Sequence, residues 1–149
     1  MVNRPKQIGT AGETAVVRYA QAAGHTLARR EVLHGGLDQG DIRLTDHIIL
    51  EVKSGHAAEQ ASDAQLTTWW AETIRERDNA HVPVGVLITK RKGVSGARCG
   101  AWNAHMDVDT LLTLLGAPRP AQHAHGHVLV HMSVDSMLAL TTTHERNHQ

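Results

Sequence analysis

Residues 40–53 read Gly40-Asp41-Ile42-Arg43-Leu44-Thr45-Asp46-His47-Ile48-Ile49-Leu50-Glu51-Val52-Lys53. Every even-numbered strand position in this stretch is apolar: Ile42, Leu44, Ile48, Leu50 and Val52. The odd-numbered positions carry Asp41, Arg43, His47, Glu51 and Lys53, with Ile49 as the exception. Because successive side chains of a strand point to opposite faces, this alternation predicts a β-hairpin with one core face and one charged face.

The register of this hairpin decides which charged side chains meet. A three-residue turn at 45–47 pairs Leu44 with Ile48 and sets Asp41 directly opposite Glu51, with Cβ atoms about 5 Å apart. A two-residue turn would instead send Asp41 and Glu51 to opposite faces, because a slip of one residue inverts the pattern. We expect the three-residue turn.

Two carboxylates opposite each other destabilise a sheet unless a positive charge lies between them. Lys53, on the same face, is one source of that charge, and a divalent cation is another, since paired carboxylates are hard-oxygen ligands. A Mg²⁺ ion shared by Asp41, Glu51 and the Val52 carbonyl could activate a water and neutralise a phosphate, with Lys53 orienting that water. The alternative is an ion-pair cluster on a wet sheet face, which contributes little. The residues alone leave both interpretations open.

Helical and strand-like segments alternate on either side of the hairpin. Apolar periodicity predicts helices over 10–23, ending before Gly24, and over 58–79. A strand is expected near 27–33, followed by a Gly-rich exposed loop, and the β-branched run 84–89 indicates a buried, central strand. These segments predict an α/β protein with a mixed central sheet flanked by helices.

The C-terminal third contains a small internal repeat. Residues 105–114 resemble residues 131–140, and both copies read as strand, N-cap and short helix, with Asp109 and Asp135 as the expected caps. The loop between them carries His123, His125 and His127. In an extended segment these alternate side chains share a face and could hold Zn²⁺ or Ni²⁺, although twelve histidines in the chain also indicate a compositional bias.

Composition limits the class of protein. The 149 residues suit one domain, and the 41% hydrophobic and 20% charged fractions are typical of globular proteins. We expect a cytoplasmic protein, because no membrane segment or signal peptide is visible. The single Cys99 excludes an internal disulfide and a multi-cysteine zinc site, and predicts a buried thiol.

Acidic and basic residues balance at 15 each, so the distribution of charge is more informative than its total. Basic side chains cluster at Arg29-Arg30 and at Lys90-Arg91-Lys92, with Arg98 nearby. Such clusters suit contacts with DNA phosphates, and the alternative is an ordinary solvated surface.

The residues Gly40-Asp41-Ile42 and Glu51-Val52-Lys53-Ser54-Gly55 resemble the PD-(D/E)XK nuclease superfamily. The resemblance implies an α-β-β-β-α-β, restriction-endonuclease-like core, in which Asp41, Glu51 and Lys53 match the two acids and the lysine. Gly40 replaces the proline of the motif, a frequent departure. More narrowly, from about residue 9 to 115 the chain is similar to archaeal-type Holliday junction resolvases and to resolvase-like nucleases of actinobacterial phages. The supporting residues are Gly12-Glu13, the motif itself, Glu72 through Arg77-Asp78-Asn79-Ala80, Gly85 to Ile88, Lys90-Arg91 and Trp102.

The resemblance implies further roles. Glu13 on the first helix would complete the metal site, although an acid near a helix N-terminus is also favourable without one. Gln65 matches the polar residue that the second helix often sends to the site, but glutamine is also an ordinary helix surface residue. Trp69 and Trp70 diverge by about 100° on a helix, so at least one should lie in the core or in a dimer contact; Trp102 is expected to be core.

The sequence thus predicts a nuclease core over 1–115 and an extension over 116–149 of loop, strand and short helix. The resemblance implies Mg²⁺-dependent cleavage of branched DNA by a homodimer, with Mn²⁺ as a substitute for Mg²⁺, in the cytoplasm of a bacterial host or of a phage-infected cell. The alternatives are a restriction-like or single-strand-cleaving nuclease of the same superfamily, and a DNA-binding protein without catalysis.

Overall fold

The structure is a computed structural model that describes residues 4–32, 36–118 and 128–149. Its elements, in chain order, are α1 (Arg4–Ala22), β1 (Arg29–Arg30), β2 (Ile42–Thr45), β3 (Ile48–Lys53), α2 (His56–Glu59), α3 (Asp63–Asn79), β4 (Val84–Thr89), the 3₁₀ helix η1 (Gly96–Ala101), β5 (Asn103–Asp107), α4 (Val108–Leu115), β6 (Leu129–Ser133) and α5 (Val134–Arg146).

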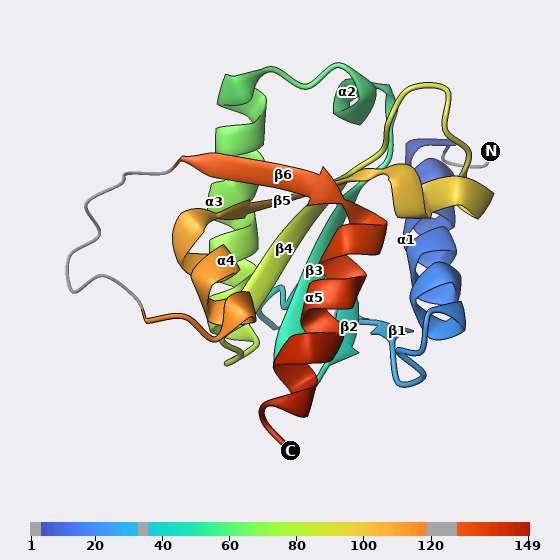
Figure 1. Cartoon of the computed structure of the whole chain (residues 1–149). Coiled ribbons are helices and arrows are strands. Elements are labelled where there is room, and N and C mark those ends of the chain that lie inside the picture. Colours follow the sequence, from blue (N-terminus) through green and yellow to red (C-terminus); the bar gives the residue numbers. More distant parts are fainter. Residues whose placement is uncertain (1–3, 33–35, 119–127) are drawn as a thin grey trace.

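The strands form one open sheet in the order β1-β2-β3-β4-β5-β6 (Figure 1). β3 and β4 pair in parallel, whereas each other neighbouring pair is antiparallel. The predicted α/β class, with a mixed central sheet flanked by helices, is therefore confirmed.

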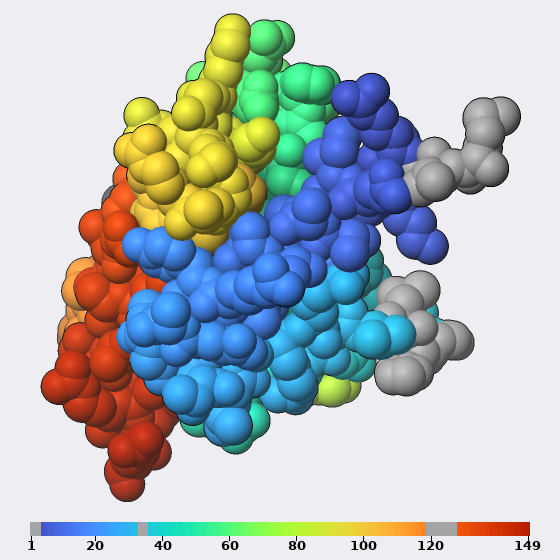
Figure 2. Space-filling model, turned by 90° about the vertical axis from the view of Figure 1, so that its right-hand side faces the viewer, coloured from blue at the N-terminus to red at the C-terminus, as the bar shows by residue number. Residues whose placement is uncertain are grey.

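Helices cover both faces of this sheet. In Figure 1, α3 lies behind the sheet and α5 lies in front of it. α1 packs on the α5 side, where the Tyr19 hydroxyl donates to Asp135 Oδ1 at 2.6 Å. Figure 2 shows α1 crossing its face of the molecule between α5 and the segment that contains β2. The two central strands are consequently buried on both sides.

The core lies mainly between the sheet and the helices of the α5 side. It includes the even-numbered residues of the hairpin, as the alternation predicts, together with apolar residues of α1 and α5: Ile42, Leu44, Ile48, Leu50, Val52, Val16, Val17, Ala20, Val134, Met137 and Leu138. Cys99 and Trp102 are also buried there, as expected, and Trp102 Nε1 donates to the Val94 carbonyl at 3.0 Å.

Two helices depart from their predicted bounds. α1 begins at Arg4, earlier than predicted, because Pro5 is tolerated in a first helical turn, and Gly24 after its end has a φ of +107°. The helix predicted over 58–79 is instead two helices, α2 and α3. Ser62 lies between them and caps α3, its Oγ accepting from the Gln65 amide at 3.1 Å.

Of the strand expected near 27–33, residues 27–32 are described, and among them only Arg29–Arg30 belong to the sheet. The repeated unit of strand and helix is present as β5–α4 and β6–α5, but the predicted caps are wrong by two residues. Asp107 and Ser133 are the N-caps, and they accept from the amides of Thr110 at 2.7 Å and Ser136 at 3.1 Å. Asp135 lies in the first turn of α5, where it accepts from Tyr19 instead.

The described part of the extension belongs to the same sheet and core. β6 pairs with β5, and Val134, Met137 and Leu138 of α5 are buried. His123, His125 and His127 lie outside the described residues. None of the helices in the described ranges has the length and apolarity needed to cross a membrane.

Candidate active site

Asp41 and Glu51 meet at the open end of the β2–β3 hairpin. The register pairs Ile42 with Leu50, so the next step outward sets Asp41 opposite Glu51. Two hydrogen bonds fix this arrangement: the Asp41 amide donates to the Leu50 carbonyl at 3.1 Å, and the Val52 amide donates to Asp41 Oδ2 at 2.8 Å.

The turn that produces this register differs from the predicted one. Thr45 rather than Leu44 pairs with Ile48, so the predicted three-residue turn is wrong and the turn is Asp46-His47. A β-bulge between Arg43 and Thr45 absorbs the extra residue on β2. The bulge compensates for the shorter turn, and Asp41 therefore remains opposite Glu51.

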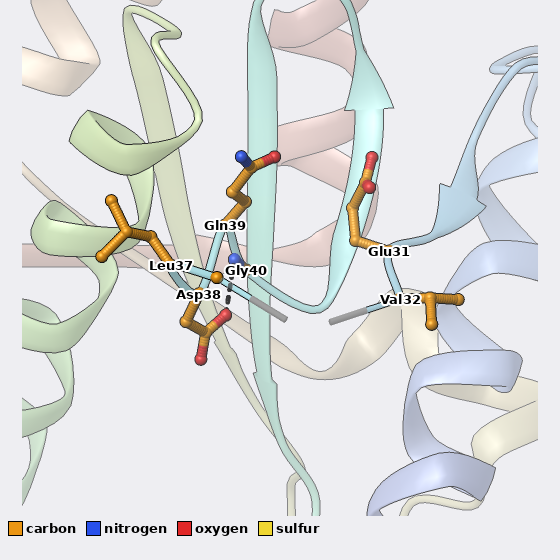
Figure 3. A pocket seen from close by; sticks show the side chains of 7 residues that line it. Glu31, Val32, Leu37, Asp38, Gln39 and Gly40 are labelled. Carbon is orange, nitrogen blue, oxygen red and sulfur yellow. Dashed lines mark hydrogen bonds between the residues drawn. The ribbon is translucent and has the colours of Figure 1, made fainter. Parts of the chain in front are cut away.

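Gly40 shapes the loop that leads into Asp41 (Figure 3). Its φ of +90° is in a region that proline cannot adopt, and its amide donates to Asp38 Oδ1 at 3.0 Å. A Cβ at this position would also lie 3.2 Å from Ile49 Cδ1. This backbone conformation therefore favours glycine at position 40 and excludes proline.

Burial makes the ionised carboxylates of this site costly. Glu51 is only 6% exposed, so its carboxyl group is not on a solvated surface. Burial and the charge of Glu51 raise the pKa of Asp41 to about 8, although the hydrogen bond from Val52 opposes the shift. Burial and the neighbouring Glu76 carboxyl raise the pKa of Glu51 to about 8, while Lys53 opposes this. The site is therefore stabilised by a proton or by another cation.

Lys53 supplies one positive charge beside these acids. Its Nζ lies 3.1 Å from Glu51 Oε1 and 3.3 Å from Glu72 Oε2. The Trp69 ring centroid is 5.7 Å from the same atom. Burial lowers the pKa of Lys53, but the charges and hydrogen bonds of Glu51 and Glu72 outweigh it and raise the pKa above its usual value. Lys53 is therefore an ammonium at neutral pH.

α3 adds two acids that sequence reasoning missed. Glu72 reaches Lys53, and Glu76, only 6% exposed, contacts the Glu51 carboxyl. Burial, with the charges of Asp38 and Asp41, raises the pKa of Glu76 to about 7. The contact between Glu51 and Glu76 is a hydrogen bond only when one of them carries a proton. As carboxylates, Glu51 Oε2 and Glu76 Oε2 are buried without a donor among the described residues.

These acids line a cavity of about 640 Å³ between the sheet and α3. Its lining residues are Leu37, Asp38, Glu51, Lys53, Glu72, Arg75, Glu76, Asp78 and Asn79. Five acidic and two basic side chains are among them, so the cavity attracts cations and repels a bare phosphate. A smaller pocket of about 200 Å³ borders the loop before Asp41 and is lined by residues that include Glu31, Asp38 and Gln39 (Figure 3).

The other predicted site residues lie at different distances from this centre. Glu13 is close enough for its charge to raise the pKa of Asp41, but its Oε2 lies 2.8 Å from Arg30 Nη2. Gln65 is in the first turn of α3 and, among the described residues, makes no side-chain hydrogen bond to Asp41 or Glu51. The spacing of Glu72 and Glu76, one helical turn apart, could have indicated the acids of α3 that do reach the site.

The predicted basic clusters flank the site. The turn that starts at Lys90 follows β4 directly, and the Lys90 amide donates to the Lys53 carbonyl at 2.9 Å. Lys92 is exposed, whereas Lys90 Nζ lies 3.2 Å from Glu59 Oε1 and Arg91 donates to the Ala101 carbonyl at 3.2 Å. On the other side, β1 places the exposed Arg29 and Arg30 beside β2.

The donor set near Asp41 suits a hard divalent cation only if water completes the coordination. Within residues 4–32, 36–118 and 128–149, no three His, Cys, Asp or Glu side chains form a group that could hold a metal ion. Asp41 and Glu51 provide two carboxylates, and the buried Glu51 Oε2 has no donor. Mg²⁺ is commonly bound by one or two carboxylates and several waters, so the residues present fit this ion.

Comparison with known proteins identifies no relative: the chain matches no family model, no curated protein and no solved structure.

Proposed function

We propose that this chain is a Mg²⁺-dependent DNA endonuclease of the PD-(D/E)XK type that hydrolyses phosphodiester bonds in branched DNA, as Holliday junction resolvases do. The observation that carries the proposal is the meeting of Asp41 and Glu51 from adjacent strands, with the Lys53 ammonium 3.1 Å from Glu51. A buried acid, a half-buried acid and a lysine suit a cation and a phosphate together, and few purely structural roles require all three.

The arrangement of elements supports the proposal. α1, β1, β2, β3, α3 and β4 follow one another in the α-β-β-β-α-β order expected of the superfamily, with the short α2 inserted before α3. Asp41 directly precedes the second strand, Glu51 is on the third strand, and Lys53 ends the third.

Each residue has a distinct role in this scheme. Asp41 and Glu51 hold the cation with the Val52 carbonyl, and Mn²⁺ can substitute for Mg²⁺. When bound, the cation lowers the pKa of a coordinated water and neutralises charge on the phosphate. Lys53 orients the attacking water and screens the phosphate, while Glu13 adds negative charge beside Asp41.

The basic clusters bind the phosphates of the DNA backbone, and such contacts position the DNA without recognising its base sequence. Lys90, Arg91 and Lys92 lie next to the Lys53 end of β3, and Arg29 and Arg30 lie beyond β2. Phosphate contacts on both sides of the site favour selection by DNA shape. Two identical sites related by a two-fold axis, in a homodimer, would nick both strands of a junction symmetrically.

The test is cleavage of a four-way junction, a linear duplex and a single strand, with Mg²⁺ or Ca²⁺. We expect cutting of the junction in Mg²⁺ only. Asp41→Ala and Lys53→Ala should each lower the rate by about 10³-fold, because each removes a group that stabilises the transition state. Asp46→Asn, in the hairpin turn, is the matched control for loss of one acidic charge.

The outcomes separate the competing functions. Preference for unbranched DNA would support a restriction-like or single-strand-cleaving nuclease and refute the resolvase assignment. DNA binding without metal-dependent cleavage would refute catalysis altogether. The acidic cavity argues against a simple DNA-binding protein, because its carboxylates repel phosphate unless a cation is present.

A further inference from the structure

The Lys53 ammonium has two acidic neighbours that come from different layers of the protein. Glu51 is on its own strand, and Glu72 is on α3, which covers that face of the sheet. Trp69 precedes Glu72 by three residues on α3, so both side chains lie on the same side of the helix. The ammonium therefore has one contact with its strand and two with the helix.

A cation at Asp41 and Glu51 would change the balance of these contacts. It would engage the Glu51 carboxylate that Lys53 now contacts, and its two positive charges would repel the ammonium. Lysine has a flexible four-carbon chain, so an ammonium without a second anchor would move out to solvent. The Lys53 side chain is already 26% exposed, so its ammonium is next to solvent.

Glu72 is the carboxylate placed to prevent this movement. Among the described residues, it forms an ion pair with Lys53 alone, at 3.3 Å. Glu76, one turn further along α3, contacts Glu51 instead. Glu72 is 35% exposed, so its pairing with Lys53 requires little removal of water from its carboxyl group.

We propose that Glu72 is the positioning residue for Lys53: it holds the ammonium at the reaction centre once Glu51 is occupied by the cation, with the Trp69 ring closing the adjacent side. The catalytic part of this inference rests on the proposed nuclease function, and the structural part does not.

The kinetic test compares Glu72→Gln, which keeps the size and removes the charge, with Asp63→Asn, which removes an acid from the start of the same helix. With Mg²⁺ and junction DNA, Glu72→Gln should lower kcat by about tenfold, as loss of an orienting partner typically does, and leave KM unchanged or lower. Asp63→Asn should change neither. An unchanged kcat in Glu72→Gln would overturn the proposal.

A structural test needs neither metal nor DNA. The Lys53 ε-methylene protons should show a ring-current shift from Trp69 in the NMR spectrum, identified by its disappearance in Trp69→Leu. Glu51→Gln removes the other anchor, so it imitates occupation of Glu51 by a cation. In that variant Glu72 should preserve the shift, and in the double variant Glu51→Gln/Glu72→Gln the shift should be lost.

Persistence of the shift in the double variant would refute positioning by Glu72, whatever the rates show. A wild-type protein that cuts no DNA would refute the proposed function and leave the NMR result standing. Each proposal can therefore fail separately from the other.

Discussion

On β3, Leu50 faces the helices of the α5 side, and its neighbour Glu51 faces α3. Both side chains are buried, at 0% and 6% exposure. The Leu50 face is largely hydrocarbon. On the Glu51 face, the buried Ile49, Leu87 and Trp70 lie in the same layer as three acids with raised pKa values, a lysine and a histidine. β3 thus contributes an apolar side chain to one face of the sheet and an acidic side chain to the other. Burial has a different effect on stability for each of them.

This difference indicates a division of labour. Burial of apolar surface favours folding, whereas burial of carboxylates opposes it unless a counter-charge is supplied. The protein therefore gains stability from apolar burial on both faces of the sheet, and on the Glu51 face the buried carboxylates offset part of that gain. Functional sites commonly carry such a cost.

The largest effect on stability should come from the hydrocarbon face. Leu50→Ala should lower the free energy of unfolding by about 4 kcal/mol, because it removes buried methyl groups and leaves a cavity. Urea denaturation measures the change. Leu27→Ala is the matched control, since Leu27 is 74% exposed and should change stability by less than about 0.5 kcal/mol. Similar losses in both variants would contradict the assignment of the core to this face.

The second-largest effect should be a loss of stability at acidic pH, caused by the buried His105 on the Glu51 face. Burial, with the nearby His131, lowers the pKa of His105 to about 4, and its Nε2 lies 2.8 Å from Thr89 Oγ1. The unfolded chain therefore binds more protons than the folded one between pH 6.5 and 4. His105 should thus lower stability by up to about 3 kcal/mol as the pH falls through that range.

Asp41, Glu51 and Glu76 act with the opposite sign, because their raised pKa values make the folded chain bind more protons as the pH falls. The contribution of His105 is therefore obtained from the free energy of unfolding in urea, measured at several pH values for the wild type and for His105→Gln. The difference between the two proteins at each pH is the contribution of His105. Parallel pH curves for the two proteins would show that His105 is not held neutral by the fold.

The smallest effect should be an increase in stability. Glu51→Gln should raise the free energy of unfolding by about 1 kcal/mol without metal at pH 8, because it removes one of two buried like charges. Mg²⁺ should stabilise the wild type and have little effect on the variant. The measurement is urea unfolding with and without Mg²⁺. Destabilisation by Glu51→Gln would show that its pair with Lys53 outweighs the repulsion from Asp41.

Several features of this protein were determined by local sequence. The period-two alternation over 42–53 specifies two strands and their faces, and it places Asp41 and Glu51 on the same side, because strand geometry leaves little choice. The β-branched run at 84–89 specifies a buried central strand for the same reason. The catalytic acids and lysine proposed here are thus visible in the sequence.

Other features needed the tertiary structure. The two-residue turn with its bulge has the same net register as the predicted turn, so the alternation alone cannot separate them. The break in the helix before α3 depends on Ser62, one of several residues that could cap a helix in that stretch.

Tertiary structure also decided what surrounds the acids and the lysine. The sequence showed a charged sheet face but not that α3 covers it. The spacing of Glu72 and Glu76 puts both acids on one side of their helix, but it does not specify that Glu72 reaches Lys53 and Glu76 reaches Glu51. Local periodicity fixes the direction of a side chain within its own element. The rotation and height of a helix on a sheet are set by the packing of both surfaces, and only the folded chain contains that information.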